Sequence, residues 1–333
     1  MTMSAVDIPA FTSAQPPDSW RLLDDVELMT QPDPEYLIEG IIPRKAVGVI
    51  YGPSGCGKTT IVAGLATSLA TGRDWFGHCV RHPGASVYVG AEDPGGFKVR
   101  LRAAKQAARL SLDRPIGCYT FPEAIDLRDV TAVARFSAFL ERAFESGDLP
   151  REVLFIDTYA ASVPGANENS AEDTTVAMDH AHKWRAQLGV TVILIHHTNA
   201  SGTRERGHSS MRGAADFMIA LSPVDDIVHI ECSKQRNGAN FPTFDVKLTP
   251  APDGGCVFRL ASDVLPGTTL TEAQAKVFAA LKDIFSANGA TKGEWQRTCP
   301  DVPERTFHRA AKVLEERAYV KAFGSHYRVI GRR

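Results

Sequence analysis

The 333-residue sequence contains no C-x-x-C pair, although six cysteines are scattered along it. Neither a zinc site nor a disulfide framework is therefore supported, and a reduced, cytoplasmic protein is the simplest expectation. Long apolar runs are missing as well, because the longest ones, such as Val190–Ile195, are far too short to span a bilayer. Residues Met1 to Pro17 lack a basic start followed by an apolar block, so we expect no secretory signal.

A large net charge is also absent. The 37 lysines and arginines against 39 acidic residues give −2, which by itself points to no nucleic-acid or membrane partner. The charge is nevertheless uneven, because Thr268–Arg333 carries 12 basic against 7 acidic residues, which is +5 and leaves −7 for the rest. An acidic body with a basic C-terminal part does not exclude a nucleic-acid partner.

From Ala46 onward, short β-branched runs alternate with amphipathic stretches. The predicted strands are Ala46–Tyr51, Ala85–Val89, Val153–Ile156 and Thr191–Ile195. The predicted helices are Thr60–Thr71, Phe97–Leu110, Val130–Glu145 and Ala171–Leu188. Apolar strands separated by helices indicate an α/β fold with a mainly parallel sheet covered on both faces. Three later runs are predicted as antiparallel additions to one sheet edge: Ile227–Cys232, Thr243–Leu248 and Cys256–Leu260.

Changes in composition divide the chain into four parts. We expect a mobile N-terminal arm (1–34), an α/β core (35–261), a linker containing Pro266-Gly267 (262–269) and a small C-terminal α+β domain (270–333). In the last part, Thr271-x-x-Gln274 is a capping-box pattern. It opens a helix with an apolar stripe of Leu270, Ala273, Val277, Leu281 and Ile284 that Gly289 ends.

Two more helices, Lys292–Arg297 and Pro303–Ala318, and a hairpin across Gly324-Ser325 complete the C-terminal domain. Three helices followed by a small hairpin are the layout of a winged helix. A generic helical cap on the core is the alternative.

The strongest motif follows the first core strand. It is a complete G-x-x-x-x-G-K-[ST] phosphate loop, made by Gly52, Pro53, Ser54, Gly55, Cys56, Gly57, Lys58 and Thr59, with Thr60 next to it. Its glycines let backbone N–H groups point at phosphate, and the helix that follows adds a partial positive charge. Lys58 can reach the β- and γ-phosphates of ATP, and the Thr59 hydroxyl can hold Mg²⁺.

Other chemistry-bearing residues follow the remaining strands. Asp157 ends an apolar strand in the Walker B manner and is the second candidate for holding Mg²⁺. Glu92 is our candidate for the base that orients water, with Asp93 as the fallback and a plain helix N-cap as the alternative. Of the adjacent His196 and His197, only one can face the nucleotide, since neighbouring side chains on a strand diverge; a buried pair or a metal site is the alternative.

Taken together, these motifs resemble those of the RecA/DnaB-type ATPases. The phosphate loop, Glu92, "FIDT" at Asp157 and "LIHHTNASG" after the fourth strand are similar to the RepA-like hexameric replicative helicases of plasmids and phages. The segment Tyr36–Pro43, which precedes the first core strand, shares this likeness, and the likeness covers roughly Pro34 to Leu260. Ser233-Lys234-Gln235-Arg236-Asn237-Gly238 is similar to the K-x-R-x-G segment of ring helicases.

The resemblance implies roles for individual residues. His197 would sense the γ-phosphate, Glu92 would be the catalytic glutamate, and Lys234 and Arg236 would reach the neighbouring subunit's ATP site. On a turn after a strand, such a pair can project outward, although a solvated surface turn is the alternative. The loop after the sensor strand would face single-stranded DNA in the channel of a homo-oligomeric ring, with a hexamer as the expected ring; its candidate DNA contacts are Arg204, Arg206 and His208.

The C-terminal domain offers an independent nucleic-acid surface. If Pro303–Ala318 is a recognition helix, Phe307, Ala311 and Leu314 face its core. The outward candidates for contacting DNA are then Arg305, Arg309 and Lys312. Protein docking is the competing use of such a surface.

The sequence thus predicts an ATP- and Mg²⁺-dependent, ring-forming DNA helicase of replication with no membrane partner. The alternative is a DNA-binding initiator or regulatory ATPase that switches assembly state without unwinding DNA. A small-molecule kinase is a third and weaker interpretation, because it accounts for neither the Lys234/Arg236 segment nor the basic C-terminal domain.

Overall fold

The computed structural model describes most of the chain. The described residues are 22–90, 93–144, 150–166, 170–198, 205, 209–251, 254–263, 272–285, 289–316 and 320–329. The chain divides into two units, Met1–Glu35 and Tyr36–Arg333. In the first unit, a five-residue helix α1 (Asp25–Met29) is capped by Asp24, whose Oδ1 accepts a hydrogen bond from the Glu27 N–H at 2.8 Å. The sequence predicts only a mobile arm there, because five residues are too few to show periodicity.

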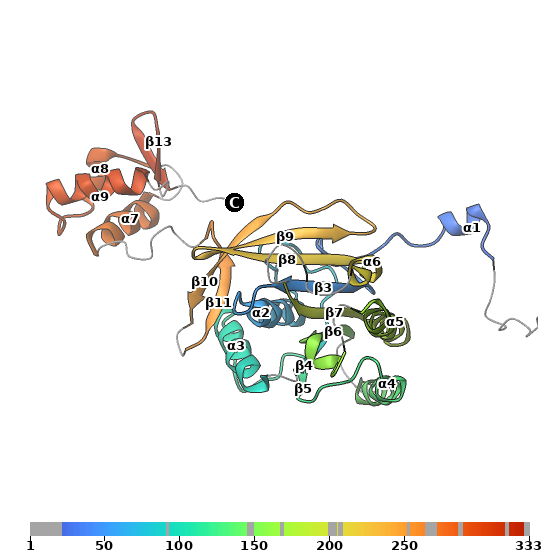
Figure 1. Cartoon of the computed structure of the whole chain (residues 1–333). Coiled ribbons are helices and arrows are strands. Elements are labelled where there is room, and N and C mark those ends of the chain that lie inside the picture. Colours follow the sequence, from blue (N-terminus) through green and yellow to red (C-terminus); the bar gives the residue numbers. More distant parts are fainter. Residues whose placement is uncertain are drawn as a thin grey trace, which may run out of the picture. The chain divides into compact units, whose positions relative to one another are not determined.

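A nine-stranded sheet dominates the second unit (Figure 1). In sheet order its strands are β11 (Cys256–Leu260), β10 (Phe244–Pro250), β9 (Ile227–Gln235), β8 (Phe217–Val224), β3 (Val47–Gly52), β7 (Thr191–His197), β6 (Arg151–Asp157), β4 (Ala85–Gly90) and β5 (Cys118–Phe121). Neighbours from β8 to β5 are parallel, and β9, β10 and β11 add antiparallel strands at one edge. This mainly parallel α/β sheet confirms the predicted class and fits a RecA-like P-loop core. A separate two-stranded sheet pairs β1 (Tyr36–Ile38) with β2 (Ile42–Pro43).

Helices cover both faces of the sheet. They are α2 (Lys58–Thr71), α3 (Pro94–Ala107), α4 (Val130–Phe144), α5 (Ala171–Leu188) and the short η1 (Ala160–Ser162) and α6 (Ser210–Ala214). A separate hydrophobic core lies on each face of the sheet, because side chains alternate between the two faces along a strand. In β3, Ile50 packs against α2 and α3, whereas Val49 packs against α4 and α5. Figure 1 shows α2 and α3 on one face and α4 and α5 on the other. Both faces of the sheet are therefore buried under helices, as the continuous apolar runs predicted.

Two strands of this sheet were not predicted. The edge strand β5 alternates poorly, since only its end residues are half-buried, and β8 was not recognised as a strand of its own. The helix expected at Phe97 begins at Pro94 instead. Asp93 caps it by accepting a hydrogen bond from the Gly96 N–H at 2.7 Å, and two glycines hide that first turn from propensity-based reasoning.

The C-terminal segment has its own hydrophobic core, which includes Trp295 and Phe307. Its elements are α7 (Glu272–Phe285), β12 (Ala290–Thr291), α8 (Lys292–Arg297), α9 (Glu304–Glu316), β13 (Val320–Phe323) and β14 (His326–Val329). The Trp295 indole N–H donates to the Val277 carbonyl at 2.7 Å and ties α8 to α7. The three predicted helices and the hairpin are thus present, with β12 as an additional strand paired to β14.

Two details of this segment differ from the sequence analysis. Ile284 is 59% exposed, because the buried stripe of α7 continues from Leu281 to Phe285 instead. The capping box forms at Thr291 and Glu294, whereas the predicted one depends on Thr271, which lies outside the described residues. In the described part of the chain, no helix is both long enough and apolar enough to span a bilayer.

Candidate active site

The phosphate loop joins the end of β3 to the start of α2. Gly55 and Gly57 have φ angles of 78° and 93°, a left-handed conformation that favours glycine. At Gly57 a side chain is also excluded by lack of space, since a Cβ there would lie 2.5 Å from the ring of Phe258. The backbone can therefore curl around an anion at the N-terminus of the 14-residue helix α2.

Lys58 lies at the centre of this loop and is buried. Its Nζ donates to the carbonyls of Gly52 at 3.0 Å and Pro53 at 2.9 Å. His197 Nδ1 lies 3.3 Å from the same Nζ, because β7 pairs with β3 in a register that places His197 opposite Gly52. His196 points to the other face, where its ring meets Tyr159 edge-on. Of the two histidines, His197 is therefore the one at the phosphate loop.

Asp157 ends β6 beside the first turn of α2. Its Oδ2 accepts hydrogen bonds from the Thr59 hydroxyl at 2.8 Å and from the Tyr88 hydroxyl at 2.9 Å. Burial, followed by the charge of Asp157, raises the pKa of Tyr88 well above its ordinary value, so this phenol remains a donor. Tyr88 was not among the predicted site residues; the available signal was an aromatic hydroxyl in a strand that otherwise holds only small or aliphatic residues.

A cavity of about 540 Å³ connects these groups. Its polar end holds Lys58, Thr59, Asp157 and His197. Its other walls come from α3, β10 and β11 and include Val99 and Leu248, which are 44% and 43% exposed. A cationic end that suits phosphates and an apolar end that suits a base match the chemistry of a nucleoside triphosphate. The Thr59 and Asp157 oxygens, hydrogen-bonded to each other, are the hard donors that Mg²⁺ prefers.

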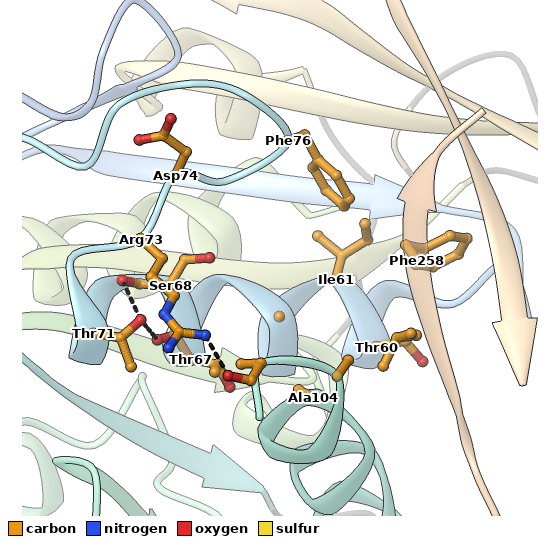
Figure 2. A pocket seen from close by; sticks show the side chains of 14 residues that line it. Thr60, Ile61, Thr67, Ser68, Thr71, Arg73, Asp74, Phe76, Ala104 and Phe258 are labelled. Atoms are coloured by element: carbon orange, nitrogen blue, oxygen red, sulfur yellow. Dashed lines mark hydrogen bonds between the residues drawn. The ribbon is translucent and has the colours of Figure 1, made fainter. Parts of the chain in front are cut away.

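A second cavity, of about 290 Å³, runs along α2 (Figure 2). Figure 2 shows Thr60 and Ile61 near Phe258 at one end, whereas Arg73 at the other end donates to the Ala108 carbonyl. Its lining includes Thr60 but none of the four polar residues that meet in the larger cavity. The candidate side chains for binding phosphate and Mg²⁺ therefore lie in the larger cavity.

Four candidate residues lie outside the described residues: Glu92, Arg204, Arg206 and His208. Asp93, the fallback for Glu92, lines the larger cavity and is the N-cap of α3. Its carboxylate also pairs with Arg100 at 3.5 Å.

Lys234 and Arg236 do not line this cavity. Gln235 pairs with Phe217, which in turn pairs with Gly48 at the start of β3. The basic pair thus lies at the opposite end of the parallel strands from the phosphate loop, about 13 Å away along β3.

The predicted outward-projecting turn is wrong for Lys234, which is part of β9. Its Nζ donates to the Arg212 and Gly213 carbonyls, and burial, followed by the charge of Arg236, lowers its pKa. Arg236 pairs with Asp216 at 2.9 Å. Both cations are therefore bound within their own chain.

A further network near this pair was not predicted. Arg212 binds the buried carboxylate of Glu205 with two hydrogen bonds, at 3.0 and 2.9 Å. It also donates to Ser233 Oγ at 2.7 Å, and the Tyr51 hydroxyl donates to the same oxygen at 2.8 Å. The network joins Glu205 to Ser233 of β9 and to Tyr51 of β3, the residue before the phosphate loop. Its members are far apart in sequence, so no local pattern reveals it.

On the C-terminal segment, the candidate DNA contacts Arg305, Arg309 and Lys312 are exposed on α9. Phe307, Ala311 and Leu314 are buried on its other side, as the sequence analysis predicted.

Comparison with known proteins gives one family. Residues 12–203 match the family described as an AAA domain. No curated protein matches the chain.

Proposed function

The chain belongs to the AAA-domain family of P-loop ATPases, and from this premise we propose that it is a ring-forming, DNA-dependent ATPase that acts as a helicase in DNA replication. The nucleotide would be ATP, bound in the 540 Å³ cavity at the phosphate loop. The partners would be single-stranded DNA and further copies of the same chain, with a hexamer as the expected ring.

The side chains of the cavity have distinct tasks in this proposal. Lys58 exchanges its carbonyl partners for the β- and γ-phosphates, and His197, 3.3 Å away, lies where it can report the γ-phosphate. Mg²⁺, held by Thr59 and Asp157, would neutralise phosphate charge. Tyr88, whose hydroxyl donates to Asp157 Oδ2, would keep this carboxylate oriented for the metal. Glu92 remains the proposed residue that orients water.

The observation that carries the shared-site proposal is the position of Lys234 and Arg236. They lie at the far end of the strands from their own phosphate loop, so Arg236 cannot stabilise charge there. A contribution to hydrolysis therefore requires a neighbouring copy, with the neighbour's phosphates replacing Asp216 as the partner of Arg236. An arginine supplied in this way accelerates hydrolysis by about 10³-fold or more.

The test is ATPase activity with and without single-stranded DNA, on the wild type and on Arg236→Ala. The variant is expected to bind ATP yet lose at least about 10²-fold in rate. Mixing it with Lys58→Ala subunits should restore activity, because each variant supplies what the other lacks. Lys247→Ala, which removes an ion-paired cation from the adjacent strand β10, is the matched control.

Unchanged turnover in Arg236→Ala, or no recovery on mixing, would contradict shared sites. The helicase activity is tested separately, by unwinding of a forked duplex. A DNA-stimulated, assembled ATPase that unwinds nothing would refute the helicase while leaving the ATPase intact.

The exposed cations of α9 support a second candidate, a DNA-binding initiator or regulatory ATPase. Here the C-terminal segment would be a winged helix that binds duplex DNA through Arg305, Arg309 and Lys312. ATP would set the assembly state. Footprinting at a defined duplex sequence without translocation would favour this candidate, and docking of a protein on α9 is the competing outcome.

A further inference from the structure

Positive charge is concentrated on α3 and the loop that follows it. Residues 94–114 contain six cations and one acid, Asp113, which is a net charge of +5 within 21 residues. The cations are Lys98, Arg100, Arg102, Lys105, Arg109 and Arg114. The chain up to residue 267 carries 25 basic against 32 acidic residues, which is −7. This segment is thus a cationic surface on an otherwise acidic body.

The fold neutralises only part of this charge. Arg100 pairs with Asp93 at 3.5 Å. Lys105 is buried, and its Nζ donates to the carbonyls of Leu112 and Arg114 at 3.4 and 2.7 Å. Lys98 and Arg102 are exposed, and no ion pair connects either of them to a carboxylate of the described residues.

Stability of the helix does not explain this arrangement. Lys98, Arg102 and Lys105 are spaced by four and three residues, so they share one face of α3 and repel one another. A row of like charges that weakens its own helix indicates an anionic partner outside the chain.

The surface beside this row is hollowed. A cavity of about 680 Å³ is lined by Lys98, Arg102 and Lys105 on one side. Leu112 and Asp113 of the loop after α3 and Thr120 of the edge strand β5 line the other side. The row extends about 10 Å along the helix axis from Lys98 to Lys105. Phe97 also lines the cavity, but it is 1% exposed and cannot stack on a base.

We propose that this α3 surface (Lys98, Arg102 and Lys105) binds the phosphate backbone of single-stranded DNA without reading its sequence. The exposed Lys98 and Arg102 would contact the phosphates, whereas the buried Lys105 would contribute only its positive charge. A regular line of phosphates matches a row of cations on one helix face, and the walls on both sides favour one strand over a duplex. The inference rests on the proposed DNA-dependent function and adds a DNA contact on α3 to those proposed for the loop after β7.

The experiment measures binding of the full chain to a fluorescent oligo(dT) by anisotropy, at several salt concentrations. In Lys98→Gln/Arg102→Gln, the slope of log affinity against log salt should become shallower by about 1.4, because about 0.7 is lost per phosphate contact on single strands. Affinity at low salt should fall about tenfold. Arg135→Gln/Arg142→Gln removes two exposed cations from α4 and is the control, expected within twofold of wild type.

Thermal unfolding separates lost binding from lost folding. The α3 variant should melt at or slightly above the wild-type temperature, since like charges have been removed from one helix face. If Lys98→Gln/Arg102→Gln has the same salt slope as the wild type, the inference is overturned and the proposed function is not. A wild-type chain that binds no DNA would overturn the proposed function with it. Competition by poly-glutamate as effective as that by oligo(dT) would assign the surface to an acidic protein instead, and would also refute the inference.

Discussion

Tyr88 gives the sharpest test of how the candidate Mg²⁺ site is held. Its hydroxyl donates to Asp157 Oδ2 at 2.9 Å, while its ring stacks on Phe97 with centroids 3.6 Å apart. Tyr88→Phe keeps the stacked ring and removes only the donor. A hydrogen bond to a charged acceptor contributes about 1.5–3 kcal/mol, and a tenfold change corresponds to about 1.4 kcal/mol. We therefore expect the Mg²⁺ concentration for half-maximal ATPase rate to rise about tenfold.

The rate at saturating Mg²⁺ should stay close to that of the wild type, because the lost bond orients Asp157 and touches no phosphate. The assay is steady-state ATP hydrolysis over a Mg²⁺ titration. Tyr119→Phe, on the edge strand β5 where the side chain is 51% exposed, is the matched control. If Tyr88→Phe and Tyr119→Phe give the same Mg²⁺ dependence, the positioning role of Tyr88 is refuted.

The raised pKa of Tyr88 adds a pH dependence with a definite sign. The phenol titrates near 10.0 in the unfolded chain and higher in the folded protein, chiefly because it is buried. Its contribution to stability is complete below about pH 10 and is lost as the pH rises toward the folded value. The free energy of unfolding of the wild type should therefore fall more steeply above pH 10 than that of Tyr88→Phe. Parallel curves in urea titrations would contradict this.

Three further predictions concern stability and reactivity. Arg44 makes two hydrogen bonds to the buried carboxylate of Glu152, at 2.9 and 2.7 Å, so Arg44→Ala should cost about 3–5 kcal/mol in urea unfolding; a loss below 1 kcal/mol would contradict a buried pair. Phe307→Ala should cost a similar 3–5 kcal/mol, because Phe307 is buried against Trp295; limited proteolysis should then cut the C-terminal segment while ATP binding persists. Burial raises the pKa of the Cys56 thiol, so maleimide at pH 7 should modify the exposed Cys79 first; faster labelling of Cys56 would contradict that assignment.

Local patterns in the sequence identified the phosphate loop and most of the sheet. A phosphate loop is a contiguous segment whose glycines are required by its own backbone, as the φ of 93° at Gly57 illustrates. Strands such as β6 are buried on both faces, so their apolar runs are visible without knowing the neighbours. The edge strand β5 lacks that burial and was missed for the same physical reason.

Contacts between distant segments could not be predicted from such patterns. His197 reaches Lys58 because β7 pairs with β3, and Tyr88 reaches Asp157 because β4 pairs with β6. Lys234 and Arg236 are predicted from a resemblance, and a turn that projects outward was expected for them. The register of β9 against β8 places them at the end of the strands opposite the phosphate loop, where both contact their own chain.

The sequence by itself determined which residues are the candidates for binding phosphate and Mg²⁺, because their motifs lie in one short loop and at one strand end. Only the tertiary structure decided which hydroxyl orients Asp157, which histidine faces Lys58 and at which end of the strands Arg236 lies. Those three outcomes depend on strand order and register, which arise from burial across the whole sheet and not from any local run of residues.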